Sequence, residues 1–477
     1  MSARGIAIGA AALAGLLVFS AYSARAAGGL SRWEIVPVWS VPVPGVQMVA
    51  DLPGGAGGPA MIVAQGPARV VVVDAAGRVL ATRDFPGGPL NAAMGDVNGD
   101  GASDVILAQG SAAGVAAYDL ALKPLWKAPA MAGLGQAARV LAVDLDGDGR
   151  SEVVVGDALG RVAAFSSAGR PLWSHAFPPA TANAEIRGLD DLSPGKGAGR
   201  LVAVARRSGE IVLLDARGKT VAGLRVSHPV RRLRVFDLDG DGRDEALIGD
   251  EGGYYQALGA DGKSAALGSL ADAVTEIRAL RSGGGTAPRS FVVAGKRGAF
   301  VLHSGRTVLA SGSVNGKVSA AGGVDGDGDG GDELFIGTEE GGLFVFDRRG
   351  EPLAEMGMPG KIERILGVES ALRDRLLVVG AGAALGGYRV RQARAPAWYS
   401  PWTPAAIGLV ALAVGALAMA RAIPPPPPVA PVVDARAEQI HLATARVADL
   451  MARGIATPEM GAARLKQLER QRAKRRV

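Results

Sequence analysis

A nine-residue acidic motif occurs four times in the chain and limits its fold more than any other feature. The motif reads D-x-[DN]-G-D-G-x-x-[DE] and begins at Asp96, Asp144, Asp237 and Asp325. These starts lie 48, 93 and 88 residues apart, which corresponds to one, two and two units of about 45 residues. A fixed period of this length predicts a chain of repeated structural units, because each repeat buries its apolar surface against its neighbours.

Two further landmarks fill the gaps between the acidic motifs and indicate eight repeats. A β-branched run ends in a small residue at positions 66, 110, 156, 205, 249, 295, 337 and 380. A glycine turn follows in most units, at Gly77, Gly169, Gly218, Gly262, Gly305 and Gly350. Glycine supplies the positive φ that a tight hairpin needs. Each unit therefore reads as four short strands, which is typical of a β-propeller blade.

The two ends of the repeat region predict how the ring closes. Two units carry a Pro-x-Trp strand, at Trp126 and Trp173, and the same pattern stands without a unit of its own at Trp39. The last unit, about 361–392, has only three strands, so the N-terminal strand would complete it. We predict an all-β, eight-bladed β-propeller over residues 33–392, closed by this strand; seven blades or an open stack are the alternatives.

Each acidic motif has the donor pattern of a calcium site. Side-chain oxygens at positions 1, 3, 5 and 9 and a backbone carbonyl at position 7 surround one point, and calcium accepts six to eight oxygen ligands. Magnesium fits less well because it retains its waters. The twelfth residue of each motif is apolar (Leu107, Val155, Ile248 and Ile336), which excludes an EF-hand, since an EF-hand has Glu there.

The motifs predict up to four structural Ca²⁺ ions, one in each loop. The predicted ligands are Asp96, Asn98, Asp100, Ala102 and Asp104; Asp144, Asp146, Asp148, Arg150 and Glu152; Asp237, Asp239, Asp241, Arg243 and Glu245; and Asp325, Asp327, Asp329, Gly331 and Glu333. Ala102, Arg150, Arg243 and Gly331 would contribute their backbone carbonyls.

Because of these acidic loops, residues 33–392 resemble the FG-GAP/VCBS repeats of integrin-α-type β-propellers. The resemblance implies that calcium is structural and lies at the periphery of the blades. The other four units lack the ligand series, and Asp51 and the pair Asp190–Asp191 are its remnants. The Pro-Leu-Trp strands resemble quinoprotein-like propeller repeats more weakly.

Two apolar segments predict a membrane topology. Residues 1–26 combine a basic start, an apolar run and an Ala-x-Ala ending, which indicates a signal peptide or, alternatively, an uncleaved anchor. Residues 402–420 carry no charge and predict a transmembrane helix, with 393–401 as the juxtamembrane linker. Trp398, Tyr399 and Trp402 suit an interfacial belt, and the basic tail suits the cytoplasmic side. A buried core helix is the alternative for 402–420.

The C-terminal tail divides into a spacer and a helical segment. Residues 424–433 are rich in proline and predict a polyproline II spacer. Residues 434–477 predict a basic cytoplasmic helical hairpin that resembles the short C-terminal (SHOCT) hairpin domain of many bacterial proteins. Such a hairpin has too small a core to stand alone, so it would pair with itself or another protein. The alternative is a basic helix that lies on anionic lipid.

The distribution of charge and the scarcity of His and Cys limit the classes of function that we expect. Residues 421–477 hold 11 Lys and Arg against five Asp and Glu, which accounts for the whole net charge of +6. The remaining chain is neutral, so we expect no nucleic-acid partner. The chain has four His and no Cys, and no catalytic constellation emerges, so we expect no enzyme activity.

We therefore expect a single-pass protein of the cytoplasmic membrane with its propeller on the periplasmic or extracellular side. The predicted role is to bind a protein partner as a scaffold, adhesion module or subunit of a membrane complex. Two alternatives stay open: a propeller that binds carbohydrate or cell wall, and a propeller enzyme such as a quinoprotein-like oxidoreductase or a lyase.

Overall fold

The computed structural model describes residues 33–392 apart from short gaps at 44, 47, 53–60, 67, 86–89, 110–113, 129–134, 136, 178–182, 283–288 and 370–374; beyond this range it describes Lys466. The predicted signal peptide (1–26), linker (393–401), transmembrane helix (402–420), spacer (424–433) and, apart from Lys466, helical tail (434–477) lie outside the described residues. Within the part that is described, no helix is long and apolar enough to cross a membrane.

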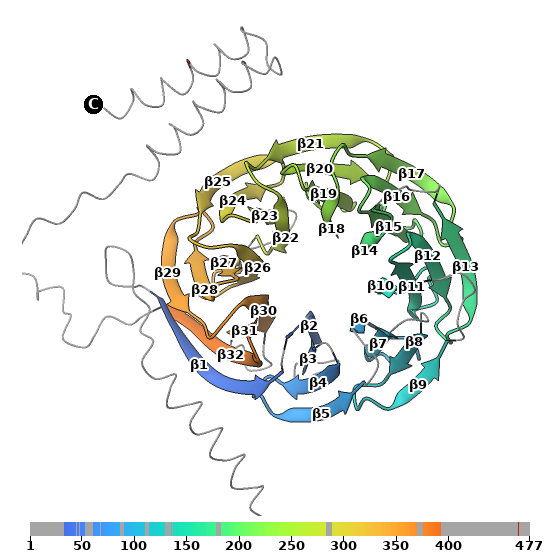
Figure 1. Ribbon diagram of the computed structural model, residues 1–477, viewed down its shortest axis with the longest axis horizontal. Coiled ribbons are helices and arrows are strands. Elements are labelled where there is room, and N and C mark those ends of the chain that lie inside the picture. Colours follow the sequence, from blue (N-terminus) through green and yellow to red (C-terminus); the bar gives the residue numbers. More distant parts are fainter. Residues whose placement is uncertain are drawn as a thin grey trace, which may run out of the picture. The chain divides into compact units, whose positions relative to one another are not determined.

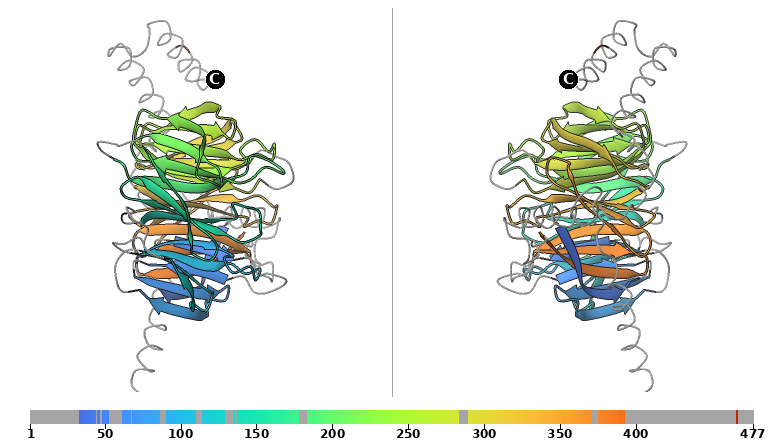
Figure 2. Two further views of the ribbon diagram at one scale, coloured as in Figure 1. Left: turned by 90° about the vertical axis from the view of Figure 1, so that its right-hand side faces the viewer. Right: turned by 90° about the vertical axis from the view of Figure 1, so that its left-hand side faces the viewer.

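The described residues of 33–392 form 32 strands in eight four-stranded antiparallel sheets, which are arranged as a ring (Figure 1). The prediction of eight blades is confirmed. We number blade 1 as β2–β5, with the next blades following in chain order, and blade 8 as β30–β32 with β1. Figure 2 shows the blades from the rim of the ring, stacked side by side.

The innermost strand of each blade comes first in the chain, and the second strand returns beside it. The innermost strands are β2 (Met48–Leu52), β6 (Leu90–Gly95), β10 (Ala137–Val143), β14 (Ile186–Leu192), β18 (Val230–Phe236), β22 (Val274–Leu280), β26 (Val318–Val324) and β30 (Ile362–Glu369). The second strands are β3 (Met61–Gln65), β7 (Asp104–Gln109), β11 (Glu152–Asp157), β15 (Leu201–Arg206), β19 (Glu245–Asp250), β23 (Ser290–Gly295), β27 (Glu333–Thr338) and β31 (Arg375–Ala381).

The third and fourth strands complete each blade toward the rim. The third strands are β4 (Arg69–Asp74), β8 (Gly114–Tyr118), β12 (Arg161–Phe165), β16 (Glu210–Leu214), β20 (Tyr254–Gly259), β24 (Ala299–Ser304), β28 (Gly342–Phe346) and β32 (Ala384–Gln392). The outermost strands are β5 (Val79–Asp84), β9 (Pro124–Lys127), β13 (Pro171–Ala176), β17 (Thr220–Arg225), β21 (Ser264–Ser269), β25 (Thr307–Ser313), β29 (Pro352–Gly357) and β1 (Trp33–Pro42).

The N-terminal strand closes the ring, as the missing fourth strand of the last unit predicted. β1 pairs with β32 along its whole length, from Trp33 opposite Gln392 to Pro42 opposite Ala384, with one bulge between Pro37 and Trp39. In Figure 1 the blue β1 lies beside the orange β32. One blade therefore joins both ends of the repeat region.

The apolar core lies between blades, which explains the β-branched runs in the sequence. The second strands β11, β15 and β27 are buried at every residue, because a neighbouring blade covers each of their two faces. The outermost strands β5, β13 and β17 alternate between exposed and half-buried residues. One apolar cluster joins Ile106 and Val115 of blade 2 to Val153 and Phe165 of blade 3.

The chain runs through every blade in the same direction, so the ring has two distinct faces. All innermost strands run in one direction, so every connection from a first to a second strand emerges on the same face of the ring, together with every hairpin from a third to a fourth strand. This face carries the four acidic loops, and we call it the acidic face. The opposite face carries the turns from second to third strands and the connections between blades, and we call it the crossover face.

The tryptophan of an outermost strand packs on the glycine hairpin of the next blade. The indole Nε1 of Trp173 in blade 3 donates to the carbonyl of Ala216 in blade 4 at 2.9 Å. A Cβ added to Gly218 of that hairpin would lie 2.6 Å from the Trp173 ring. Trp39 in β1 makes the equivalent bond to Ala75 of blade 1 at 3.0 Å. These tryptophans therefore join neighbouring blades at the rim.

Two glycine-to-alanine variants distinguish the effect of the tryptophan contact from the effect of the positive φ. Gly218 and Gly262 both have positive φ, 76° and 78°, but a Cβ on Gly262 would meet only Ala222, at 3.6 Å. We expect G262A to cost about 1–2 kcal/mol through backbone strain alone. G218A should cost roughly a further 1–3 kcal/mol because it overpacks against Trp173. Urea unfolding measures both, and equal losses would show that the tryptophan contact contributes nothing.

Candidate metal centres

The four acidic loops occupy equivalent places in blades 2, 3, 5 and 7. Residues 96–104 join β6 to β7, 144–152 join β10 to β11, 237–245 join β18 to β19, and 325–333 join β26 to β27. Each loop begins where an innermost strand ends and finishes at the first residue of a second strand. The strand positions therefore bring the first and ninth residues of each motif close together.

Backbone N–H groups hold the first carboxylate of each loop. In blade 3, Asp144 accepts hydrogen bonds from the amides of Gly147 at 2.7 Å and Gly149 at 3.0 Å. These two glycines have φ of +83° and +86°, a conformation that other residues rarely adopt. The ninth residue, Glu152, accepts from the amide of Leu145 at 3.0 Å. The same pattern recurs in the other three loops.

Three loops bring carboxylate oxygens within 4.8 Å of one another, close enough to hold one metal ion. The converging residues are Asp144, Asp146 and Glu152; Asp237, Asp239 and Glu245; and Asp325, Asp327 and Asp329. Asp148 and Asp241 lie outside these groups and accept from the amides of Arg150 and Arg243, both at 2.8 Å. The carbonyls at position 7 stay predicted ligands.

The first loop differs because Asn98 stands at its third position. The Asn98 side-chain nitrogen donates to Asp100 at 3.0 Å and lies 3.5 Å from Asp104. An amide nitrogen does not ligate a cation, so the side chain must rotate to present its oxygen. We therefore expect the loop at Asp96 to bind a cation more weakly than the other three.

Burial and crowding of negative charge raise the pKa of the ninth residue. Burial, followed by the neighbouring carboxylates, raises the pKa of Glu245 and of Glu333 to about 7 and that of Asp104 to about 6. The pKa of Glu152 is raised for the same reasons. A cation in the loop would offset this repulsion, so the donor set fits a divalent ion.

Two of the four acidic motifs lie in a stretch that matches a family model. Residues 96–155 match the FG-GAP-like repeat family. This stretch contains the loops of blades 2 and 3. A comparison with curated proteins gave no significant match.

The fold itself is similar to propellers of known structure. BamB from Moraxella catarrhalis is 13% identical, with a TM-score of 0.53, and 75% of this chain and 100% of that chain are covered. Sqt1 from Saccharomyces cerevisiae is 11% identical, with a TM-score of 0.58, and 76% and 100% are covered. At these identities the similarity shows the fold alone.

The eighth residue of three acidic loops, Ser151, Asp244 and Asp332, contacts the preceding blade, which sequence reasoning missed. Asp244 of blade 5 donates its N–H to Ser193 of blade 4 at 2.8 Å, and its carboxylate accepts from the Ser193 amide at 2.8 Å. Asp332 of blade 7 makes the same pair of contacts with Arg281 of blade 6. The acidic loops therefore also connect blades, and the only signal was a polar residue at position 8.

Arginine side chains neutralise some of the acidic groups on this face. In blade 4, where the ligand series is missing, Arg200 lies 2.9 Å from Asp191 and 3.9 Å from Asp244. In blade 7, Arg348 pairs with Asp329, the fifth residue of the loop. A cation at this loop would compete with Arg348 for the same carboxylate.

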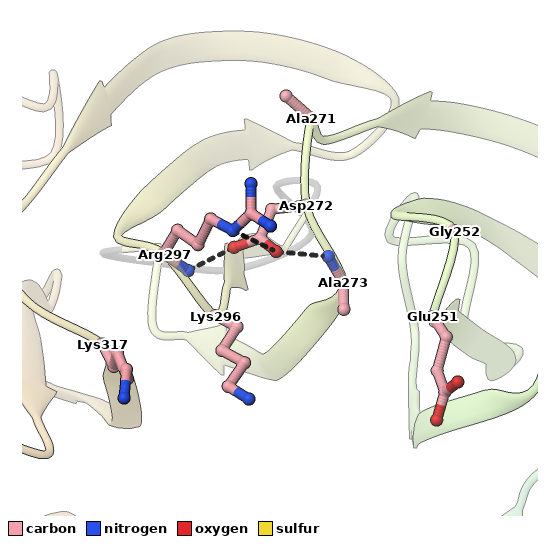
Figure 3. Close-up of a pocket in the computed structure, with 8 residues that line it drawn as sticks. All are labelled: Glu251, Gly252, Ala271, Asp272, Ala273, Lys296, Arg297 and Lys317. Carbon is pink, nitrogen blue, oxygen red and sulfur yellow. Dashed lines mark hydrogen bonds and ion pairs between the residues drawn. The ribbon is translucent and has the colours of Figure 1, made fainter.

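A separate pocket of about 500 Å³ opens on the crossover face between blades 5, 6 and 7 (Figure 3). Asp272 accepts from the backbone N–H groups of Arg297 and Ala273 and lies 4.0 Å from the Arg297 guanidinium. Lys296 and Lys317 lie around the same opening, and Lys296 extends away from Asp272. Sequence spacing could not reveal this pocket because its residues come from three blades.

One histidine–carboxylate pair also forms only in the fold. His228 Nδ1 lies 3.6 Å from Asp250, and the imidazole stacks on Tyr254 with ring centroids 5.5 Å apart. Twenty-two positions separate the two partners, so the pair could not be predicted from the sequence.

The raised pKa of Glu245 predicts a pH dependence for the metal-free protein. An acid whose pKa rises on folding stabilises the fold fully below its unfolded pKa, and this contribution is lost as pH rises through about 7. The variant E245Q stays uncharged, so between pH 5 and pH 8 in EDTA its Tm should gain roughly 1–3 °C relative to wild type. Exposed Glu355 on β29 provides the control, E355Q. Parallel Tm curves for wild type and E245Q would contradict the assignment.

Proposed function

We propose that the chain is a membrane-anchored, calcium-stabilised β-propeller that binds a protein partner outside the cytoplasmic membrane. It would act as a scaffold, an adhesion module or a subunit of a membrane complex. The observation that carries the proposal is a set of exposed apolar side chains on the outermost strands.

These side chains form what we call the apolar rim, and they occur on six of the eight outermost strands. The apolar rim consists of Val36, Val38, Val79, Leu80, Leu125, Leu172, Val221, Val308 and Leu309. Leu172 and Val221 are 51% and 53% exposed. An outermost strand also presents unpaired peptide groups along its free edge. Apolar side chains beside a free edge support binding of a protein partner rather than a small molecule.

The apolar rim is densest where the ring closes. Four of its members lie on β1 and β5, the outermost strands of blades 8 and 1, which are neighbours in the ring. Val38 is 46% exposed, and Leu80 is 46% exposed. We propose that the partner contacts this part of the rim.

Calcium is the cation that the acidic loops favour. The loops offer only oxygen donors, and flexible oxygen cages of this kind suit calcium better than magnesium. The FG-GAP-like match covers two of the four loops. We propose a structural role, because the loops also hold neighbouring blades together.

The membrane anchor rests on the sequence. Residues 402–420 are apolar and are followed by the basic tail, while residues 1–26 direct the propeller out of the cytoplasm. The propeller would then lie on the outer side of the membrane, and the tail would pair with itself, another protein or anionic lipid inside.

Chelation tests the calcium sites. Adding calcium at about 100 times its Kd should stabilise the fold by about 2.7 kcal/mol for each independent site, so EDTA should lower the Tm by several degrees. The variant D237N removes a carboxylate that the loop of blade 5 brings into its cluster and should reduce the calcium-induced shift. The control D261N removes an exposed carboxylate from a hairpin and should leave the shift unchanged. Equal Tm in EDTA and calcium would refute the sites.

Crosslinking in intact membranes, followed by purification of the full chain, tests the partner. We expect one protein to copurify with wild type and to be lost from the double variant Val38→Asp, Leu80→Asp, because a charge opposes burial of the rim. Ser264→Asp is the matched control, since it places the same charge at an exposed site on β21, whose described side chains contribute nothing to the apolar rim. Retention of the partner by the double variant would refute the rim as its site.

A further inference from the structure

The innermost strands carry a group of arginines that the metal sites and the apolar rim do not use. We call it the arginine ring, and it consists of Arg139 on β10, Arg187 on β14, Arg232 and Arg234 on β18, Arg278 on β22, and Arg364 on β30. Each innermost strand packs beside the innermost strands of the two flanking blades. Five blades therefore supply guanidinium groups to the centre of the propeller.

The arginines face one another across the centre. Arg364 belongs to blade 8 and Arg232 to blade 5, yet both line one pocket. Arg232 and Arg234 also help to lower the pKa of Arg364, after the larger effect of burial. Burial and the neighbouring guanidinium groups also lower the pKa of Arg139 to about 10. These groups stay charged at neutral pH, so the centre holds concentrated positive charge.

One carboxylate is shared among three of these arginines. Glu276 on β22 has a side chain only 3% exposed and lies 3.2 Å from Arg232, 3.4 Å from Arg278 and 3.7 Å from Arg234. Burial alone would raise the pKa of Glu276, but the arginines outweigh it and hold this pKa below its ordinary value. Glu276 is therefore ionised and cannot neutralise three guanidinium groups alone.

The remaining acidic groups near the ring do not balance it. Among described side chains, the carboxylates beside the arginine ring or lining its pocket are Glu185, Asp190, Glu276, Glu339 and Glu363. Six guanidinium groups and the ammonium group of Lys361, which lines the same pocket, face these five carboxylates and leave a surplus of at least two positive charges. A dianion would balance this surplus.

Two guanidinium groups of the arginine ring have an unused donor. The Nε atoms of Arg187 and Arg232 are buried and have no hydrogen-bond partner among the residues that the structure describes, whereas the Nε atom of Arg278 lies 3.4 Å from Glu276. The side chains of Arg187 and Arg232 are 25% and 29% exposed. A buried donor without an acceptor costs about 1–3 kcal/mol. An oxyanion with several acceptor oxygens would remove that cost.

A pocket gives access to the ring from the crossover face. It has a volume of about 400 Å³ and is lined by Arg232 and Arg364, with Lys361, Thr275, Glu339 and Glu363 beside them. This volume suits a small molecule. The planar fork of arginine matches the oxygen geometry of phosphate and carboxylate, and two or more arginines favour the higher charge of phosphate.

We propose that the arginine ring binds a small phosphate-bearing molecule through the pocket at its crossover-face end. The site is independent of the partner surface on the apolar rim, because it lies on the innermost strands of the blades and the rim lies on the outermost strands. Arg364 and Arg232 contact the phosphate, and Glu276 keeps the guanidinium groups in place.

Isothermal titration of the calcium-loaded, desalted full chain in detergent tests the site. The probes are inorganic phosphate, glycerol phosphate and succinate, each at one ionic strength set with sodium chloride. We expect both phosphates to bind and succinate to bind at least tenfold more weakly. Equal binding of succinate overturns the phosphate assignment. An acidic peptide that binds when neither phosphate does overturns the small-ligand assignment.

Variants locate the binding. R364Q should weaken phosphate binding about tenfold or more, and R364K should lose less, because lysine keeps the charge but not the fork. R225Q is the matched control, since Arg225 is exposed on the outermost strand β17. The calcium-induced Tm shift verifies that each variant is folded, and R364K carries the test if R364Q is unstable. Equal loss in R364Q and R225Q, or unchanged binding in R364Q and R364K, overturns the proposal.

Discussion

The structure depends on burial of each blade between two neighbours. The second strands are buried at all residues in β11, β15 and β27, and no single four-stranded sheet could cover such a strand on both faces. Every blade therefore needs a neighbour on each side, which only a closed ring provides. The pairing of β1 with β32 is the step that satisfies this need, because it completes the last blade with residues from the start of the chain.

Hydrogen bonds add to the apolar contacts between blades in two places, the rim and the acidic face. At the rim, Trp39 and Trp173 donate to the carbonyls of the next blade. On the acidic face, Asp244 and Asp332 bond to the loops of the preceding blade. An ion in an acidic loop would therefore stabilise more than its own nine residues, since the same loop forms part of a joint between blades.

The sequence predicted those features that leave a local or periodic mark. The spacing of the acidic motifs indicated the number of blades, and the unmatched Trp39 strand indicated the closure. The converging carboxylates of three loops follow from the motif, but the role of Asp244 does not, because its partner Ser193 lies 51 positions away. The arginine ring was also missed. Residues 1–420 have no net charge, but this sum covers the whole segment. It conceals a local surplus of positive charge that forms only when the fold brings the arginines together.

The acidic loops and the arginine ring lie toward opposite faces of the propeller and carry opposite charge. Innermost strands begin at the crossover face, where Arg187, Arg232 and Arg364 lie within the first three residues of their strands, and they end at the acidic loops. Arg232 stands five residues before Asp237, the first residue of the acidic loop of blade 5, so about 17 Å of strand separates them. This is about twice the screening length of about 8 Å at physiological salt. A cation at one end and an anion at the other would thus bind with little mutual influence through space. Any coupling between them would have to pass through the innermost strands themselves, because each connects an arginine of the ring directly to a loop of the acidic face in blades 3 and 5.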